Sequence, residues 1–158
     1  MGDQTPYMPV APGQTAPKAR LTKLQKAELI RSVGIFSDAA VEELFRLAAI
    51  AQEVDFAAQE TIFREGDIGD AFYLVVQGKV ASVARSGTLR EVSGPGEVVG
   101  LYSVLTREPR FTTATALEDT FAISIGAEDL YSLLSNNMEI VVSIFKHFVK
   151  RLGMGPKA

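Results

Sequence analysis

The sequence has no cysteine, no tryptophan and a single histidine. Without cysteine, the chain can form no disulfide, no thiolate nucleophile and no cysteine-bound metal site. One histidine is too few for the zinc sites that proteins usually build. The formal net charge of −3 provides no overall basic field, which disfavours DNA or RNA as the main partner. We therefore expect no metal and no resident cofactor.

Long hydrophobic runs are also missing. No apolar stretch approaches the ~20 residues that span a bilayer, and the N-terminus lacks the charged start and apolar core of a secretory signal. Pro6 stands where an N-myristoylation signal has serine or threonine. What is present is 158 residues that are 47% hydrophobic, which suits one domain with a packed core. We expect a cytoplasmic protein without a membrane partner.

Proline concentrates at the start of the chain. Residues 1–20 hold four of the seven prolines and little apolar content, which predicts a flexible tail that is either passive or a partner-binding arm. Residues 21–152 are predicted to form the domain, and residues 153–158 a second short tail. That second tail is too short for a helix-turn-helix, so we expect no direct DNA binding by this chain.

Helical periodicity marks both ends of the predicted domain. A first helix is predicted over residues 21–33 with Gly34 as its C-cap, and a second begins after Ser37 as its N-cap. From residue 127 the helical period returns in two pieces. The last piece carries a broad apolar stripe that either packs on the domain's own sheet or associates with another chain. The stripe comprises Met138, Val141, Val142, Phe145, Phe148, Val149 and Leu152.

Between the helices, short apolar runs alternate with glycine-containing turn signals. Runs spaced by about 8–12 residues predict an antiparallel sandwich or barrel rather than a βαβ fold. The fold class is therefore mainly β, with about eight strands between helical flanks. The runs that we identify are residues 61–63, 71–76, 79–84, 88–92, 111–116 and 120–125.

Within this region, one segment has a distinctive sequence. Residues 64–80 read REGDIGDAFYLVVQGKV, which closely resembles the signature of the cyclic nucleotide-binding domain family. The resemblance extends over about residues 21–152 and implies an eight-stranded antiparallel jelly roll with N-terminal and C-terminal helices. It is the fold of the catabolite-activator and protein-kinase-A regulatory-subunit type. Independently, Gly66 and Gly69 are expected to adopt positive φ in a tight turn, and Gly78 to form a hairpin turn or bulge.

The resemblance also implies a phosphate-binding cassette. Its pattern of a glycine, a glutamate, a short helix and a later Pro-Arg aligns with residues 99–114, with the spacing preserved. The residues expected to bind the ligand are Gly100, Leu101, Tyr102, Ser103, Arg110, Phe111 and Thr112. By resemblance, the amides near Tyr102 and Ser103 and the guanidinium of Arg110 hold an anion.

The sequence departs from the cassette at two positions. Leu101 replaces the glutamate that accepts a hydrogen bond from the ribose 2′-hydroxyl, and Glu97 is not expected to reach the same place. The loss amounts to about 3–5 kcal/mol, which makes cyclic AMP (cAMP) or cyclic GMP a weak ligand. Phe111 stands where the family prefers a small residue, and its ring either crowds the pocket or offers a stacking face.

Two interpretations of Arg110 stay open. Either it binds an anionic ligand, such as a weakly held cyclic nucleotide or a cyclic dinucleotide, or it pairs with a local carboxylate such as Glu108. The first predicts a regulatory sensor that signals through the cassette and the C-terminal helix. The second predicts a ligand-free domain for protein interaction or dimerisation. No catalytic constellation is visible, and His147 lacks a base partner and nucleophile, so we expect no enzyme.

Overall fold

The computed structural model describes residues 21–153. The tail predicted at residues 1–20 and the end of the second tail, residues 154–158, lie outside the described residues. No helix within the described range has both the length and the apolarity needed to cross a membrane.

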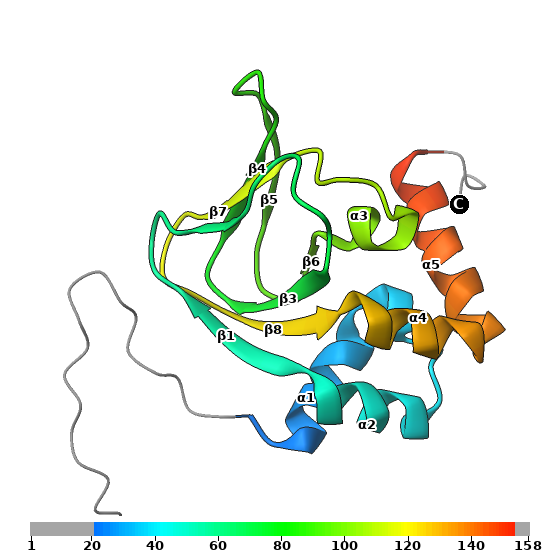
Figure 1. The fold of residues 1–158 in the computed structure, drawn as a ribbon. Helices are drawn as coiled ribbons and strands as arrows, with labels where there is room; N and C mark the ends of the chain where they lie inside the picture. Colours follow the sequence, from blue (N-terminus) through cyan, green and yellow to red (C-terminus); the bar gives the residue numbers. More distant parts are fainter. Residues whose placement is uncertain (1–20, 154–158) are drawn as a thin grey trace, which may run out of the picture.

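Eight antiparallel strands form two four-stranded sheets that face each other as a jelly roll (Figure 1), which confirms the predicted fold class. The first sheet has the order β1-β8-β3-β6, with β1 Gln52–Phe56, β3 Ala71–Gln77, β6 Val98–Val99 and β8 Thr120–Gly126. The second has the order β2-β7-β4-β5, with β2 Thr61–Phe63, β4 Val80–Val83, β5 Leu89–Ser93 and β7 Thr113–Ala116. Strands β1 and β6 had not been predicted from the sequence.

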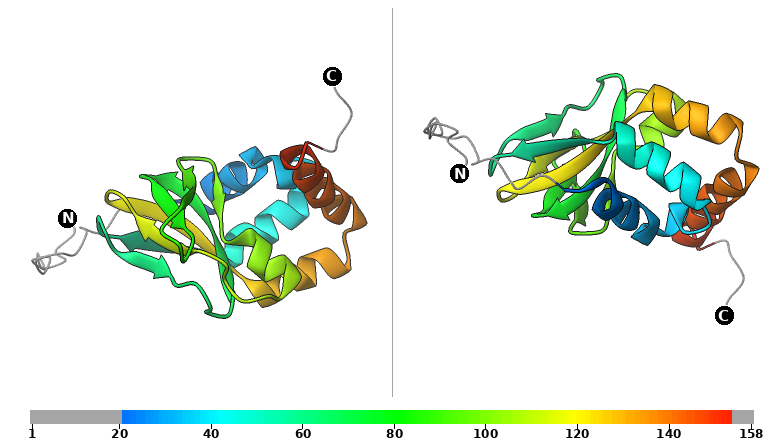
Figure 2. Two further views of the ribbon diagram at one scale, coloured as in Figure 1. Left: turned by 90° about the horizontal axis from the view of Figure 1, so that it is seen from above. Right: turned by 90° about the horizontal axis from the view of Figure 1, so that it is seen from below.

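The longer helices gather at one end of the roll (Figures 1 and 2). They are α1 Lys23–Ser32, α2 Val41–Ile50, α4 Ala127–Ser135 and α5 Met138–Arg151, with a short 3-10 helix, η1, at Gly34–Phe36. The remaining helix, α3 Leu101–Thr106, begins directly after β6. The order of helices, roll and helices therefore agrees with the prediction.

Strand β3 separates two apolar cores because successive side chains point to opposite faces. Phe72 and Leu74 pack with the helices in the larger core. Tyr73 and Val75 face the other way and pack within the smaller core, which fills the interior of the roll. The interior of the roll is thus lined by apolar side chains beside the predicted cassette.

The helix boundaries correct two predictions. Helix α1 starts from a capping box at Thr22, and its C-cap is Val33; Gly34 instead opens η1. Helix α2 has Ala40, not Ser37, as its N-cap. The Ser37 hydroxyl is engaged elsewhere, because it donates to the carbonyl of Gly34 at 2.9 Å. The short 3-10 turn therefore delays the second helix by one turn.

Helix α5 packs through a face that differs from the predicted stripe. Its buried residues are Ile140, Ser143 and Ile144, and the Ser143 hydroxyl donates to Asp38 at 2.8 Å. Five residues of the stripe are instead exposed: Met138, Val141, Val142, Phe145 and Leu152. Packing within the domain therefore leaves these five residues uncovered, although Phe148 packs against the helical core.

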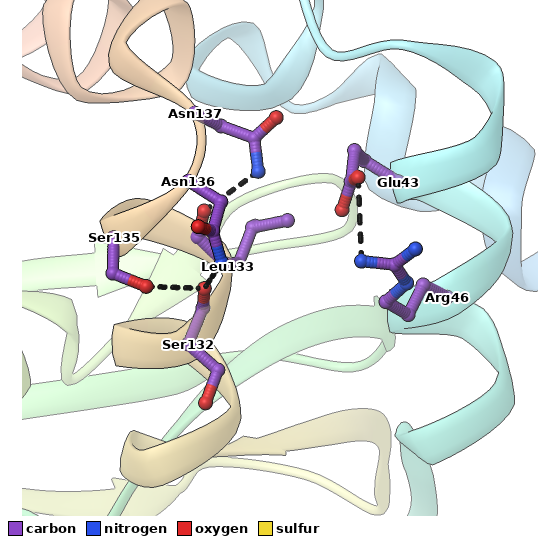
Figure 3. A network of polar contacts seen from close by, with 7 residues as sticks. All are labelled: Glu43, Arg46, Ser132, Leu133, Ser135, Asn136 and Asn137. Carbon is purple, nitrogen blue, oxygen red and sulfur yellow. Dashed lines mark hydrogen bonds and ion pairs between the residues drawn. The ribbon is translucent and has the colours of Figure 1, made fainter.

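The break between α4 and α5 lies beside α2 (Figure 3). The Asn137 amide donates to the carbonyl of Leu133 at 2.7 Å, so a side chain takes over one of the last carbonyls of α4. On α2, Glu43 pairs with Arg46 at 3.4 Å. The predicted division of the C-terminal region into two helices is confirmed, and the break falls at Asn136 and Asn137.

The three glycines of the signature have different structural reasons. Gly66 has a φ of 90° and Gly78 a φ of 100°, as expected for turn positions. Gly69 does not have a positive φ, so that prediction was wrong. A Cβ on Gly69 would instead lie 3.0 Å from the Cβ of Ser103. Close packing against the cassette helix, and not backbone conformation, requires a glycine there.

Candidate functional site

Two left-handed residues shape the cassette between β6 and β7. Gly100 is the N-cap of α3 with a φ of 83°, and Arg107 is its C-cap with a φ of 60°. Left-handed conformations reverse the chain sharply at both ends of the helix. The chain is thereby turned back towards the roll, and it brings Arg110 beside Gly100.

The side chain of Arg110 lies inside the protein. It is only 3% exposed, and its Nη1 donates to the carbonyl of Gly100 at 2.6 Å. Its Nη2 donates to the carbonyl of Ala71, at the start of β3. Its Nε is buried and has no hydrogen-bond partner among residues 21–153. The guanidinium thus links the cassette to the roll and keeps one donor unused.

No carboxylate neutralises this charge directly. The ion pairs formed within residues 21–153 belong to Arg46, Arg85 and Arg151. The alternative in which Arg110 pairs with Glu108 is therefore wrong for the described structure. Burial lowers the pKa of Arg110 from its ordinary value, while the charges of Tyr73, Asp70 and Asp67 act in the opposite direction. Arg110 is a buried cation that is supported mainly by carbonyl dipoles.

Aromatic rings form the wall beside the guanidinium. The Cζ of Arg110 lies 4.0 Å from the ring centroid of Phe63, which is a cation–π arrangement. The ring of Tyr73 stacks on Phe63 at 6.5 Å between centroids and meets Phe56 edge-on at 5.8 Å. Burial is also the main cause that raises the pKa of Tyr73. The interior of the roll next to Arg110 is therefore largely apolar.

The backbone fixes Arg110 from a second direction. Its amide donates to the carbonyl of Asp67 at 2.8 Å, and its carbonyl accepts from the amide of Gly66 at 2.7 Å. These two bonds join the signature turn to the cassette. The two motifs that were identified separately in the sequence are therefore one structural unit.

The remaining predicted residues divide between the interior and the surface. Leu101 is buried in the helical core and contributes no acceptor. Thr112 is 6% exposed, and its hydroxyl forms no hydrogen bond with residues 21–153. Ser103 is likewise buried, at 2% exposed. The roles of these residues in ligand binding stay predictions.

Tyr102 and Phe111 form a pair on the surface of the cassette. They are 44% and 56% exposed, and their rings meet edge-on with centroids 5.3 Å apart. The phenyl ring of Phe111 therefore lies outside the roll interior and leaves a face in solvent. Glu97 does not replace the missing acceptor, because its carboxylate accepts from the amide of Gly94 at 3.0 Å within its own turn.

Sequence reasoning missed the aromatic wall and the carbonyl of Ala71. The alternation along β3 was a usable signal for Tyr73, since it places this residue on the face opposite Phe72 and Leu74. No sequence signal marks a backbone carbonyl as the partner of an arginine. The partner of Arg110 therefore required the structure.

Comparison with known proteins identifies the family. The family model for the cyclic nucleotide-binding domain matches residues 53–137. A CRP-like cAMP-activated global transcriptional regulator of Mycobacterium tuberculosis is 30% identical over 129 residues, which are 79% of this chain and 58% of that protein. The chain belongs to the cyclic nucleotide-binding domain family. It spans little more than half the length of this regulator.

Solved structures agree with this assignment. The N-terminal domain of a transcriptional regulator from Streptomyces coelicolor is 31% identical, with a TM-score of 0.65 and coverage of 78% of this chain and 91% of that one. The Thermus thermophilus catabolite activator protein is 30% identical, with a TM-score of 0.65 and coverage of 75% and 58%. This family of regulatory and sensor domains is the class to which the fold and the cassette belong.

Proposed function

We propose that this chain is a non-enzymatic sensor domain that binds the phosphate of an anionic nucleotide through Arg110. The observation that carries the proposal is the buried guanidinium, which has no carboxylate partner and an unused Nε donor. A buried charge without a countercharge is costly, and a buried donor without an acceptor adds to that cost. A phosphate oxygen supplies both the charge and the acceptor.

The side chain at position 101 bears on the identity of the nucleotide. Leu101 is packed in the helical core, and Glu97 is engaged in its own turn. The free 2′-hydroxyl of cAMP or cyclic GMP therefore finds no carboxylate at either position. These mononucleotides are expected to bind weakly. A cyclic dinucleotide depends less on that carboxylate and is the second ligand class of the proposal.

Signal output is proposed to pass through the C-terminal helices. The Tyr131 hydroxyl of α4 donates to the carbonyl of Val104 in the cassette helix. The guanidinium of Arg107, at the end of that helix, lies 4.4 Å from the centroid of the same ring. A displacement of α3 by ligand therefore pulls on α4, and α5 follows α4 after a break of two residues.

The test is thermal unfolding with millimolar cAMP, cyclic GMP, cyclic di-GMP, cyclic di-AMP and ATP, one at a time. A ligand at about 100 times its Kd stabilises by ~2.7 kcal/mol, or roughly 5–10 °C for a domain of this size. Arg110→Ala should abolish the shift, whereas the exposed Arg90→Ala should retain it. Arg110→Lys keeps the charge and guards against misfolding of the alanine variant. A shift that survives in both Arg110 variants contradicts the proposal.

A second candidate function, self-association, is favoured by the stripe on α5. Met138, Val142, Phe145, Val149 and Leu152 follow alternating spacings of four and three residues. That repeat is typical of a coiled-coil seam, so a second copy of the chain is the proposed partner. Phe145 is 69% exposed, and Phe145→Ser should shift sedimentation from dimer to monomer. The control is Leu24→Ser, which changes an exposed leucine of α1. This variant should leave the assembly unchanged.

A further inference from the structure

A hollow of about 450 Å³ lies between the cassette and α4, and Arg110 is not among the residues that line it. Its walls are the turn at residues 68–70, the cassette at Ser103 and residues 107–109, and the first part of α4 at residues 126–129 together with Tyr131. These three segments are distant in the sequence, and the roll brings them to one place.

The walls carry an excess of negative charge. Four carboxylates line the hollow, those of Asp70, Glu108, Glu128 and Asp129, against the single cation of Arg107. None of the four forms an ion pair within residues 21–153. The guanidinium of Arg107 is turned to the ring of Tyr131. Asp70 also acts electrostatically on Arg110, so the carboxylates left for a ligand in the hollow are chiefly those of Glu108, Glu128 and Asp129.

These carboxylates do not converge as metal ligands do. Within the described residues, no group of three or more acidic, histidine or cysteine side chains is placed to hold a metal ion. The charge is distributed around the walls instead. Such an arrangement suits a long cationic side chain, whose several N–H donors can meet carboxylates on different walls.

Ser103 provides a second and independent observation. It lines the hollow, it is only 2% exposed, and its hydroxyl has no hydrogen-bond partner within residues 21–153. The Ser103 hydroxyl is therefore available to donate to, or accept from, a group that enters the hollow. Gly69 keeps the floor open, since a Cβ there would press on Ser103 at 3.0 Å.

The rim adds an apolar contact. Ile68 also lines the hollow and is 85% exposed. An exposed isoleucine beside carboxylates matches a segment that carries both a cationic and an aliphatic side chain. The acidic walls disfavour nucleic acid and anionic membrane surfaces, which carry the same sign of charge.

We propose that this hollow is a docking site for a short segment of a partner protein that bears arginine or lysine next to an aliphatic residue. The cation lies among the carboxylates of the walls, the buried Ser103 hydroxyl bonds the segment, and Ile68 packs on its aliphatic part. A hollow of this size accepts a few side chains and not a globular face, so the complex is small and transient.

The test uses a fluorescein-labelled eight-residue peptide of alternating arginine and leucine, with fluorescence anisotropy in the absence of nucleotide. The matched peptide has neutral citrulline in place of arginine. We expect the citrulline peptide to bind at least about tenfold more weakly, which corresponds to ~1.4 kcal/mol. Affinity for the arginine peptide should also fall as salt is raised. Equal binding of the two peptides overturns the proposal.

The variants locate the site. Glu128→Gln with Asp129→Asn should weaken the arginine peptide about tenfold, and Ser103→Ala should weaken it by a smaller factor. The control is Glu42→Gln with Glu139→Gln, which removes the same charge from exposed first-turn positions of α2 and α5. Unfolding temperatures confirm that each variant folds. An equal loss in the control shows attraction to net charge alone and overturns the proposal.

Discussion

Gly100 has no side chain at the point where the guanidinium of Arg110 lies. A Cβ on Gly100 would be 2.6 Å from Nη1 of Arg110 and 3.0 Å from the ring of Phe63. The spacing of the two residues within the cassette thus has a steric meaning in this chain: the glycine makes room for the arginine.

Gly100→Ala is therefore expected to expel the guanidinium and to destabilise the domain. The left-handed backbone alone costs about 1–2 kcal/mol for a residue with a Cβ, and the clash with Arg110 adds to it. Urea unfolding measures the loss. Gly34→Ala is the control, because nothing lies within 4 Å of its added Cβ. Equal stability of the two variants would contradict this account.

Gly78 and Gly87 separate backbone strain from steric clash. Both have positive φ, 100° and 87°, but only Gly78 is crowded: its Cβ would lie 2.7 Å from the carbonyl oxygen of Asp119. Gly87→Ala should cost about 1–2 kcal/mol from strain alone. Gly78→Ala should cost clearly more, since rigid backbone must move. Comparable free energies of unfolding for the two variants would contradict an added steric cost at Gly78.

The Tyr131 hydroxyl is expected to couple α4 to the cassette helix. Tyr131→Phe removes its bond to the Val104 carbonyl but keeps the ring under Arg107. We expect a loss of about 0.5–1.5 kcal/mol and faster amide hydrogen exchange in α3. Tyr102→Phe is the control, since the exposed Tyr102 hydroxyl forms no hydrogen bond within residues 21–153. Unchanged exchange in Tyr131→Phe would remove this link from the proposed signal path.

Acidification is expected to weaken the domain partly through His147. Burial lowers the pKa of His147, the charge of Arg151 lowers it further, and Glu91 acts in the opposite direction. A histidine whose folded pKa lies below the unfolded value stabilises above that unfolded value, near 6.5, and loses the contribution as pH falls through the folded pKa. His147→Gln should lose less Tm than the wild type between pH 7.5 and 5.5. Parallel profiles of Tm against pH for the wild type and His147→Gln would refute a role of His147 in acid destabilisation.

Much of the fold was predictable because turn residues and apolar periods agree along most of the chain. Strand β1 was missed because Gln52–Phe56 has only two apolar residues, Val54 and Phe56, and so forms no continuous apolar run. Strand β6 was missed because it has two residues. The start of α2 was misplaced because Ser37 has the chemistry of an N-cap, yet the 3-10 turn uses its hydroxyl. Local sequence propensity does not show whether the Ser37 hydroxyl caps the helix or bonds within the turn.

The position of the candidate site in the chain was predictable, but the groups that surround Arg110 were not. The spacing predicted a short helix after Gly100, and the structure has it at Leu101–Thr106; ligand binding by Gly100 and Arg110 stays a prediction. The sequence left open whether Arg110 meets a carboxylate, and only the three-dimensional arrangement shows carbonyls and the Phe63 ring around it. Similarly, the apolar stripe of α5 did not reveal which face is buried. Both questions depend on neighbours distant in the sequence.

The burial of Arg110 also limits how fast a ligand can bind and leave. A guanidinium that is 3% exposed, stacked on Phe63 and bonded to two carbonyls must be uncovered before an anion can reach it. Observed binding rates should therefore level off at high ligand concentration, at the rate of uncovering. Release is slowed by the same barrier. If Arg110 binds the ligand as proposed, the domain averages its input: it responds to a sustained rise in ligand and not to a brief one.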